Sequence, residues 1–107
     1  MNPVATHELI VTIVSRGYSD VVMDAARAAG ATGGTVVHAR SIGHKEAERF
    51  LGVTIEPEKE IVLITVSSAK KQAIMKAIAT QTSAQTESKA FLMALPINGV
   101  IGTSAAT

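Results

Sequence analysis

Few side chains in this sequence could carry out acid–base or metal chemistry, and they stand far apart. Its three histidines are His7, His38 and His44, and cysteine does not occur. Catalysis needs an acid, a base, a nucleophile or a metal ion held in mutual contact, and no such group can be read from these positions. The sequence therefore predicts a protein that is not an enzyme, with no catalytic residues and no assigned metal ligands.

The surroundings of the three histidines favour different roles. His7 stands at the start of one apolar stretch and His38 lies inside another, where a hydrogen-bonded structural histidine is the favoured interpretation. His44 lies between Gly43 and Lys45 in a long polar segment. A cation beside a flexible backbone can meet an anion there, and a solvated loop residue is an equally good interpretation.

Charged residues near the middle and the end of the sequence offer two further kinds of site. Lys89 follows a polar segment and opens the final strand, so it is the cation best placed to reach a phosphate held between subunits. A charge that protects a sheet edge is the alternative role for this lysine. We interpret most of the central carboxylates as surface charge, and a Mg²⁺ site formed by two of them is the less favoured alternative because their spacing has no Mg²⁺ signature. These carboxylates are Glu46, Glu48, Glu56, Glu58 and Glu60.

The composition is that of one globular domain. The chain has 107 residues, of which 47% are hydrophobic and 18% are charged, and its net charge is +1. This balance excludes a disordered chain and gives no basic field for nucleic acid. No signal peptide or membrane span is recognisable, and the lack of cysteine fits a reducing compartment. We expect a cytoplasmic single domain over residues 1–107 that does not insert into a membrane.

A strand–helix–strand pattern occurs twice and must position these residues. The segments, in chain order, are 7–14, 18–30, 33–41, 58–66, 68–82 and 88–95. A doubled unit of this kind predicts an α+β, ferredoxin-like βαββαβ sandwich, with a four-stranded antiparallel sheet and two helices on one face. The apolar character of the strands also favours an oligomer, because the second face of the sheet would gain from being covered.

The boundaries of these elements carry local signals. We expect Ser19 to cap the first helix and Gly30 to end it, and Ser67 or Ser68 to cap the second helix. We expect Pro96 to stop the last strand.

Three segments lie outside the repeated units. The connector 41–57 is longer than an ordinary hairpin loop, and we expect it to be functional and mobile until something binds, with a short helical turn over 45–51. The segment 82–89 reads as a polar loop, and 97–107 as a C-terminal tail. Neither GxGxxG nor GxxxxGK[ST] occurs, so no conventional phosphate loop is expected.

The order of these elements resembles the PII nitrogen-regulatory signal-transduction family over residues 8–95. In that family a G-x-G-R-Q segment lies at the base of the T-loop, and the matching segment here keeps Gly43. A B-loop of the form T-G-x-x-G-D-G-K precedes the last strand. The matching segment 82–89 keeps Thr82 and Lys89, replaces the acid by Glu87, and lacks the three glycines.

The resemblance implies a divergent PII-like homotrimer that acts as a non-catalytic regulator. It would sense a small anionic metabolite, with an adenine nucleotide as the expected ligand and no required cofactor, at clefts between subunits. The T-loop-like connector 41–57 would then control a target protein, such as a membrane transporter or a metabolic enzyme. The resemblance places these residues at the ligand: Ser41, Gly43, His44, Lys45, Thr82 and Lys89.

A second family offers an alternative with the same architecture. A divalent-metal-binding trimer that resembles the CutA family would use His7, His38 and His44 as its candidate ligands.

Overall fold

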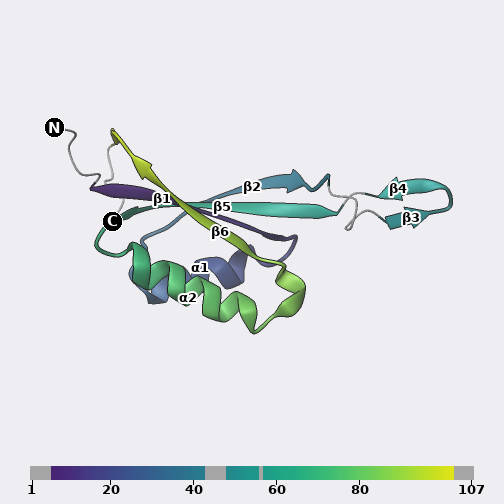
Figure 1. Ribbon diagram of the computed structural model, residues 1–107, viewed down its shortest axis with the longest axis horizontal. Helices are drawn as coiled ribbons and strands as arrows, with labels where there is room; N and C mark the ends of the chain where they lie inside the picture. Colours follow the sequence, from purple (N-terminus) through teal and green to yellow (C-terminus); the bar gives the residue numbers. More distant parts are fainter. Residues whose placement is uncertain (1–5, 43–47, 56, 103–107) are drawn as a thin grey trace.

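The fold is built on a four-stranded antiparallel sheet in the computed structural model, which describes residues 6–42, 48–55 and 57–102 (Figure 1). The strands are β1 (His7–Ser15), β2 (Thr35–Arg40), β5 (Glu58–Ser67) and β6 (Phe91–Ile97), in the spatial order β2-β5-β1-β6. Runs of β-branched residues explain the two inner strands, because such side chains pack well on a pleated surface.

Two helices, α1 (Ser19–Ala28) and α2 (Lys71–Ser83), cover one face of this sheet (Figure 1). Val22 and Ala26 of α1 and Ile74 and Ile78 of α2 are fully buried, and their spacing places each pair on one side of its helix. Gly30 follows α1 with a φ of +114°, a conformation in which glycine commonly ends a helix, as predicted. The predicted α+β, ferredoxin-like βαββαβ sandwich is confirmed.

The starts of the helices differ from the prediction. α1 begins at Ser19 itself, α2 begins at Lys71, and neither has a capping hydrogen bond from a side chain at its cap position. Ser67 is the last residue of β5, and the N–H of Ser68 donates to the carbonyl of Thr6 at 2.9 Å. The predicted cap positions are therefore wrong, because Tyr18 and Lys70 stand at the N-caps of α1 and α2.

The other face of the sheet is apolar, and no described helix covers it (Figure 1). Strand pairing places Ile13 opposite both Ile61 and Phe91, so these side chains share one face. Phe91 is 60% exposed and Leu95 is 45% exposed. We call this surface the open face, and its residues are Leu9, Val11, Ile13, Val37, Ile61, Leu63, Phe91, Met93 and Leu95.

Part of the connector forms a separate hairpin of β3 (Glu48–Phe50) and β4 (Val53–Ile55), which lies beyond the end of the main sheet (Figure 1). Leu51 and Gly52 join the strands with φ angles of +49° and +80°, as in the tight turns that suit a two-residue hairpin. The predicted helical turn is therefore wrong over 48–51, and the rest of it lies outside the described residues.

The C-terminal elements also differ from the prediction. The segment 82–89 is not a simple loop, because α2 continues to Ser83 and a 3₁₀ turn, η1 (Thr86–Ser88), follows. Pro96 does not stop the last strand, since β6 continues to Ile97 with Pro96 opposite Glu8. β6 is an edge strand, where the missing N–H of proline is tolerated.

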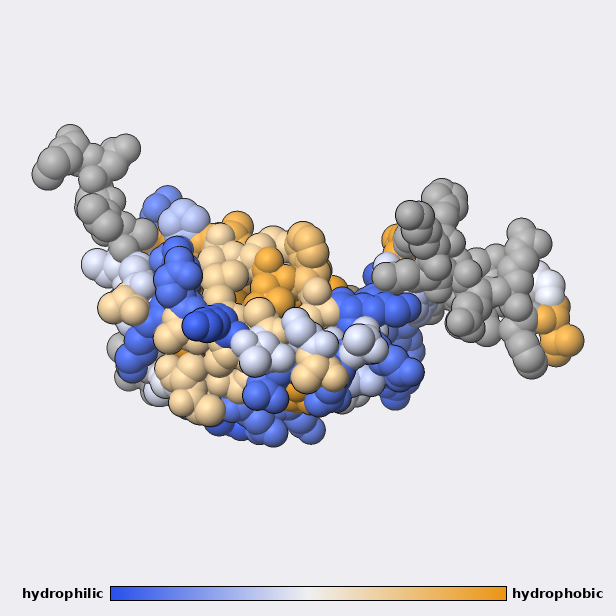
Figure 2. Space-filling model, turned by 60° about the horizontal axis from the view of Figure 1, so that its bottom comes forward, coloured by the Kyte–Doolittle hydropathy of each residue, from blue (hydrophilic) through white to orange (hydrophobic). Residues whose placement is uncertain are grey.

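The outer side of the helices has a shallow groove of about 390 Å³ between α1 and α2, lined largely by alanines such as Ala25 and Ala77. Figure 2 brings this side of the molecule forward and shows moderately hydrophobic surface beside hydrophilic residues. No described helix is both long and apolar enough to cross a membrane.

Candidate functional site

A pocket of about 440 Å³, which we call the corner pocket, lies where the end of α2, η1 and the start of β6 meet. Four hydroxyl-bearing side chains and one lysine line it, together with an apolar floor. Such a mixture suits a small ligand that carries an anionic group. The lining residues are Ala79, Thr82, Ser83, Thr86, Ser88, Lys89, Ala90 and Leu92.

Two internal hydrogen bonds fix the corner pocket. The buried hydroxyl of Thr82 donates to the carbonyl oxygen of Ile78 at 2.7 Å. The buried hydroxyl of Ser88 donates to the carbonyl oxygen of Thr82 at 3.0 Å, which holds η1 against the end of α2. These bonds satisfy polar groups that would otherwise be costly to bury.

Lys89, which lies just before β6, has an unusual backbone conformation. Its φ of +49° and ψ of +46° place it in the left-handed region, which a residue with a side chain rarely adopts. The side chain is exposed and contributes to the lining of the corner pocket. Lys89 is therefore a cation held in a strained conformation beside a polar cavity.

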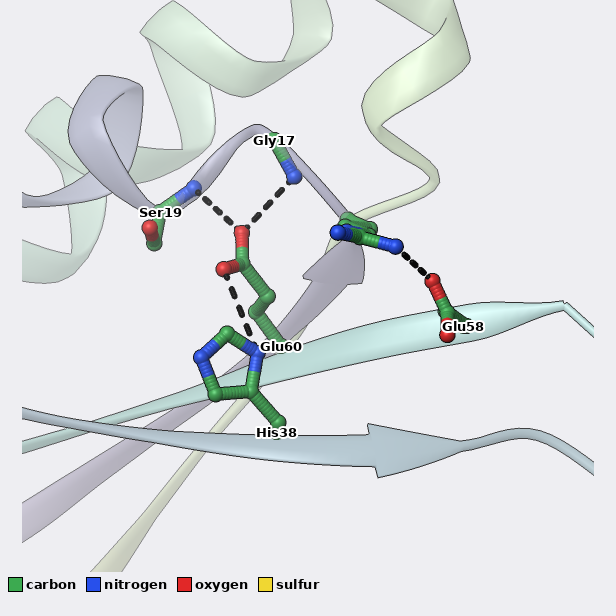
Figure 3. Close-up of polar contacts among 6 residues, drawn as sticks. Gly17, Ser19, His38, Glu58 and Glu60 are labelled. Atoms are coloured by element: carbon green, nitrogen blue, oxygen red, sulfur yellow. Dashed lines mark hydrogen bonds and ion pairs between the residues drawn. The ribbon is translucent and has the colours of Figure 1, made fainter.

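A second group of charged residues lies around the two ends of the connector, and Figure 3 shows the contacts of His38, Glu58 and Glu60. Glu60 is only 7% exposed, and its Oε1 accepts hydrogen bonds from the N–H of Gly17 at 2.8 Å and of Ser19 at 3.4 Å. On the other side, Nδ1 of His38 lies 3.8 Å from Oε2 of Glu60. We call Arg16, His38, Glu58, Lys59 and Glu60 the root cluster.

The pKa of Glu60 lies below its ordinary value. Burial raises this pKa, but the N–H donors of Gly17 and Ser19, the Ser19 hydroxyl and the charge of His38 all lower it and outweigh burial. The carboxylate also lies at the N-terminal end of α1, where the helix dipole favours a negative charge. Glu60 is therefore ionised at neutral pH and takes the capping role that the sequence assigned to a serine.

The root cluster fastens the connector to the turn that precedes α1. The N–H of Arg16 donates to the carbonyl of Glu58 at 3.2 Å, and the two side chains form an exposed ion pair. The N–H of Ser41 donates to the carbonyl of Pro57 at 2.9 Å, so the two ends of the connector lie side by side. A pocket of about 260 Å³, the root pocket, lies among Arg16, His38, Ala39, Glu58 and Lys59.

The predicted ligand residues do not all meet within one chain. Thr82 and Lys89 lie together in the corner pocket, whereas Ser41 follows β2 at the opposite edge of the sheet. β5 and β1 lie between these edges, so three strand spacings, or about 14 Å, separate β2 from β6. Gly43, His44 and Lys45 lie outside the described residues.

The two described histidines are far from each other. His7 is opposite Ser67 and His38 is opposite Glu60, which are seven steps apart on β5, or about 23 Å. A hydrogen bond of 3.0 Å joins Nδ1 of His7 to Oγ1 of Thr6, as predicted. His38 is largely exposed, and its contact with Glu60 is longer than a hydrogen bond, so the predicted hydrogen-bonded role is wrong for this residue. The described residues contain no group of three or more potential metal ligands.

Glu60 is buried, although the sequence analysis grouped it with carboxylates that were mostly interpreted as surface charge. Its position contained a usable signal, because Glu60, Val62, Ile64 and Val66 alternate along β5 and all point to the buried face. The period of two therefore predicts an inward carboxylate at the start of β5. Its partners come from the turn before α1, which alternation within β5 cannot identify.

Comparison with known families gives one match that spans nearly the whole chain. The family described as Nitrogen regulatory protein P-II matches residues 7–103. No curated protein sequence matches the chain.

Three of the solved structures that match the chain illustrate the shared fold. The PII protein of Arabidopsis thaliana bound to citrate has a TM-score of 0.68 and 17% identity over 96% of this chain and 85% of its own. A DUF3240 family protein from Shewanella baltica has a TM-score of 0.64 and 16% identity, covering 94% and 99% of the two chains. CutA from Synechococcus elongatus has a TM-score of 0.60 and 16% identity, covering 87% and 78%.

Proposed function

Because the chain belongs to the nitrogen regulatory P-II family, we propose that it is a non-catalytic signal-transduction protein that senses a small anionic metabolite. The proposed ligand is an adenine nucleotide, bound at clefts between subunits, and the proposed output is control of a target protein through the connector 41–57. The fold relative from Arabidopsis thaliana holds citrate, which is itself a small anion.

The observation that carries this proposal is the placement of the two polar pockets. The root pocket lies on the β2 side and the corner pocket on the β6 side, and both lie at the same end of the sheet. This is the end where β2 and β1 finish and where β5 and β6 begin. A second copy whose β2 side approaches the β6 side of the first would bring a root pocket and a corner pocket together.

The open face provides the reason to assemble. Its nine apolar side chains include Phe91 and Leu95, which are substantially exposed in a single chain. Each fully buried side chain of this size contributes about 1.5–3 kcal/mol relative to leaving it exposed. We propose a homotrimer in which the open faces meet at the centre.

The root cluster suggests how binding would reach the connector. Ser41 and Pro57 are joined by a backbone hydrogen bond, and the adjoining Glu58 is tied to Arg16. A ligand held beside this junction would favour one arrangement of the connector over the others, which is a population shift. The target protein would then recognise the favoured arrangement.

Two measurements test the proposal. Isothermal titration with ATP, ADP, AMP and cyclic AMP measures nucleotide binding, and light scattering of the protein as it elutes from a size-exclusion column measures the mass of the assembly. We expect a trimer that binds at least one of these nucleotides, and slower trypsin cleavage after Lys45 and Arg49 in the connector when the nucleotide is present. Lys76→Ala provides a matched control for replacement of Lys89, because Lys76 is an exposed lysine of α2 outside the corner pocket.

Two results would overturn the proposal. A monomer at working concentration would remove the clefts between subunits. Binding of Cu²⁺ or Zn²⁺ without binding of any nucleotide would favour the CutA-like alternative instead.

A further inference from the structure

The corner pocket has few hydrogen-bond donors left for a ligand. Four of the six backbone N–H groups in 84–89 already donate to carbonyl oxygens of the chain, at distances of 2.9–3.4 Å. They belong to Ala84, Gln85, Ser88 and Lys89. A loop that cradles a polyphosphate needs such groups free and close to the ligand, so this segment does not form one.

The side chains also offer few free hydrogen-bond donors. The hydroxyls of Thr82 and Ser88 donate to backbone carbonyls. Ser83 and Thr86 are exposed, and within the described residues their hydroxyls have no hydrogen-bond partner. Two hydroxyls and the ammonium group of Lys89 therefore remain to meet an anion in the corner pocket.

The charge of the pocket is also small. Lys89 is the one cation among its described lining residues, and Glu87 lies two positions before it in the chain. A phosphate monoester carries about −1.5 to −2 charges near pH 7, and a triphosphate carries more. Within the corner pocket, one ammonium with a carboxylate close by in the sequence fits the smaller charge better. A root pocket from a second copy would add an Arg16 that is already paired with Glu58.

We propose that the corner pocket takes a single phosphate group, so that a nucleoside monophosphate is preferred over a triphosphate. This inference rests on the proposed function and specifies its ligand class. The hydroxyls of Ser83 and Thr86 and the ammonium of Lys89 bind the phosphate oxygens, while Ala79, Ala90 and Leu92 form the apolar floor.

Titration of adenosine, AMP and ATP into the full chain at one ionic strength tests the preference. We expect AMP to bind at least as tightly as ATP and at least tenfold more tightly than adenosine. ATP binding tenfold tighter than AMP would overturn the inference and leave the proposed function standing. If none of the nucleotides binds, the inference and the proposed function both fall.

Single substitutions test the donors. Thr86→Ala and Ser83→Ala should each weaken AMP binding several-fold, because each removes a hydrogen bond to a charged group, and should leave adenosine binding unchanged. Gln85→Ala is the matched control, since Gln85 is exposed in the same turn but does not line the pocket. Unchanged AMP affinity in both hydroxyl variants, with thermal unfolding like that of the parent, would overturn the assignment.

Discussion

Replacing Lys89 by glycine should make the protein more stable while weakening its ligand binding. Lys89 has φ and ψ of +49° and +46°, and a residue with a Cβ has a cost of about 1–2 kcal/mol in that conformation. Glycine removes this cost, but its greater conformational freedom stabilises the unfolded chain by about 0.4–1 kcal/mol. The midpoints of these two ranges leave the Lys89→Gly variant about 0.8 kcal/mol more stable than the Lys89→Ala variant.

The alanine variant is the right reference because it loses the ammonium group but keeps the strained backbone. Lys89 is exposed, and its side chain has no ion pair or hydrogen bond within the described residues, so both variants lose little packing. A gain of this size raises the melting temperature of a domain of about 100 residues by about 3–6 °C. Protein concentration must be equal in all samples, because assembly contributes to apparent stability.

Differential scanning calorimetry and nucleotide titration on the same two variants separate the two roles of Lys89. Both variants should bind nucleotide more weakly by over about 1 kcal/mol, as for loss of a charge-assisted contact. The glycine variant should also have a higher melting temperature than the alanine variant. A glycine variant that is no more stable than the alanine variant would refute the argument from backbone strain, and unchanged affinity would remove Lys89 from the site.

Two further substitutions test the core and the root cluster. Thr12→Val should raise the free energy of unfolding by about 1 kcal/mol in urea, because the fully buried Thr12 hydroxyl has no hydrogen-bond partner among the described residues; a less stable variant would show that this hydroxyl is satisfied. Glu60→Gln should lower stability at neutral pH by about 1–3 kcal/mol, because it weakens the hydrogen bonds at the start of α1. The pKa of Glu60 is lowered on folding, so its stabilisation is present above the unfolded pKa and is lost as the pH falls through the folded pKa. Urea unfolding between pH 7 and pH 3 should therefore show a smaller decline for the variant, and parallel curves would contradict the ionised state of Glu60.

The sequence predicted the main sheet and helices well because their signals are local. The apolar run 9–14 identifies β1, and Gly30 marks the end of α1. The hairpin in the connector was missed because the residues before Leu51 favour a helix by composition, whereas the left-handed turn at Leu51 and Gly52 determines the structure. A strand ending before Pro96 was predicted because the sequence alone does not say which strands lie at an edge.

The candidate site was harder to predict because it depends on contacts across the chain. Thr82 was identified by resemblance and Lys89 by its position before the last strand as well as by resemblance, and both line the corner pocket. Glu60 was missed because the groups that need its charge belong to Gly17 and Ser19, more than forty positions away. The opposite edges on which Ser41 and Lys89 lie follow from strand order, which local patterns do not specify.

The hydrogen bond between Ser41 and Pro57 has a consequence for how this protein can change over time. β2 and β5 are already paired up to Arg40 and Glu58, so the sheet closes before the chain departs into its hairpin. The pairing does not involve the intervening residues, so changes in their number should cost the sheet little. Descendants of this sequence can therefore change the length and composition of that segment while inheriting an unaltered scaffold.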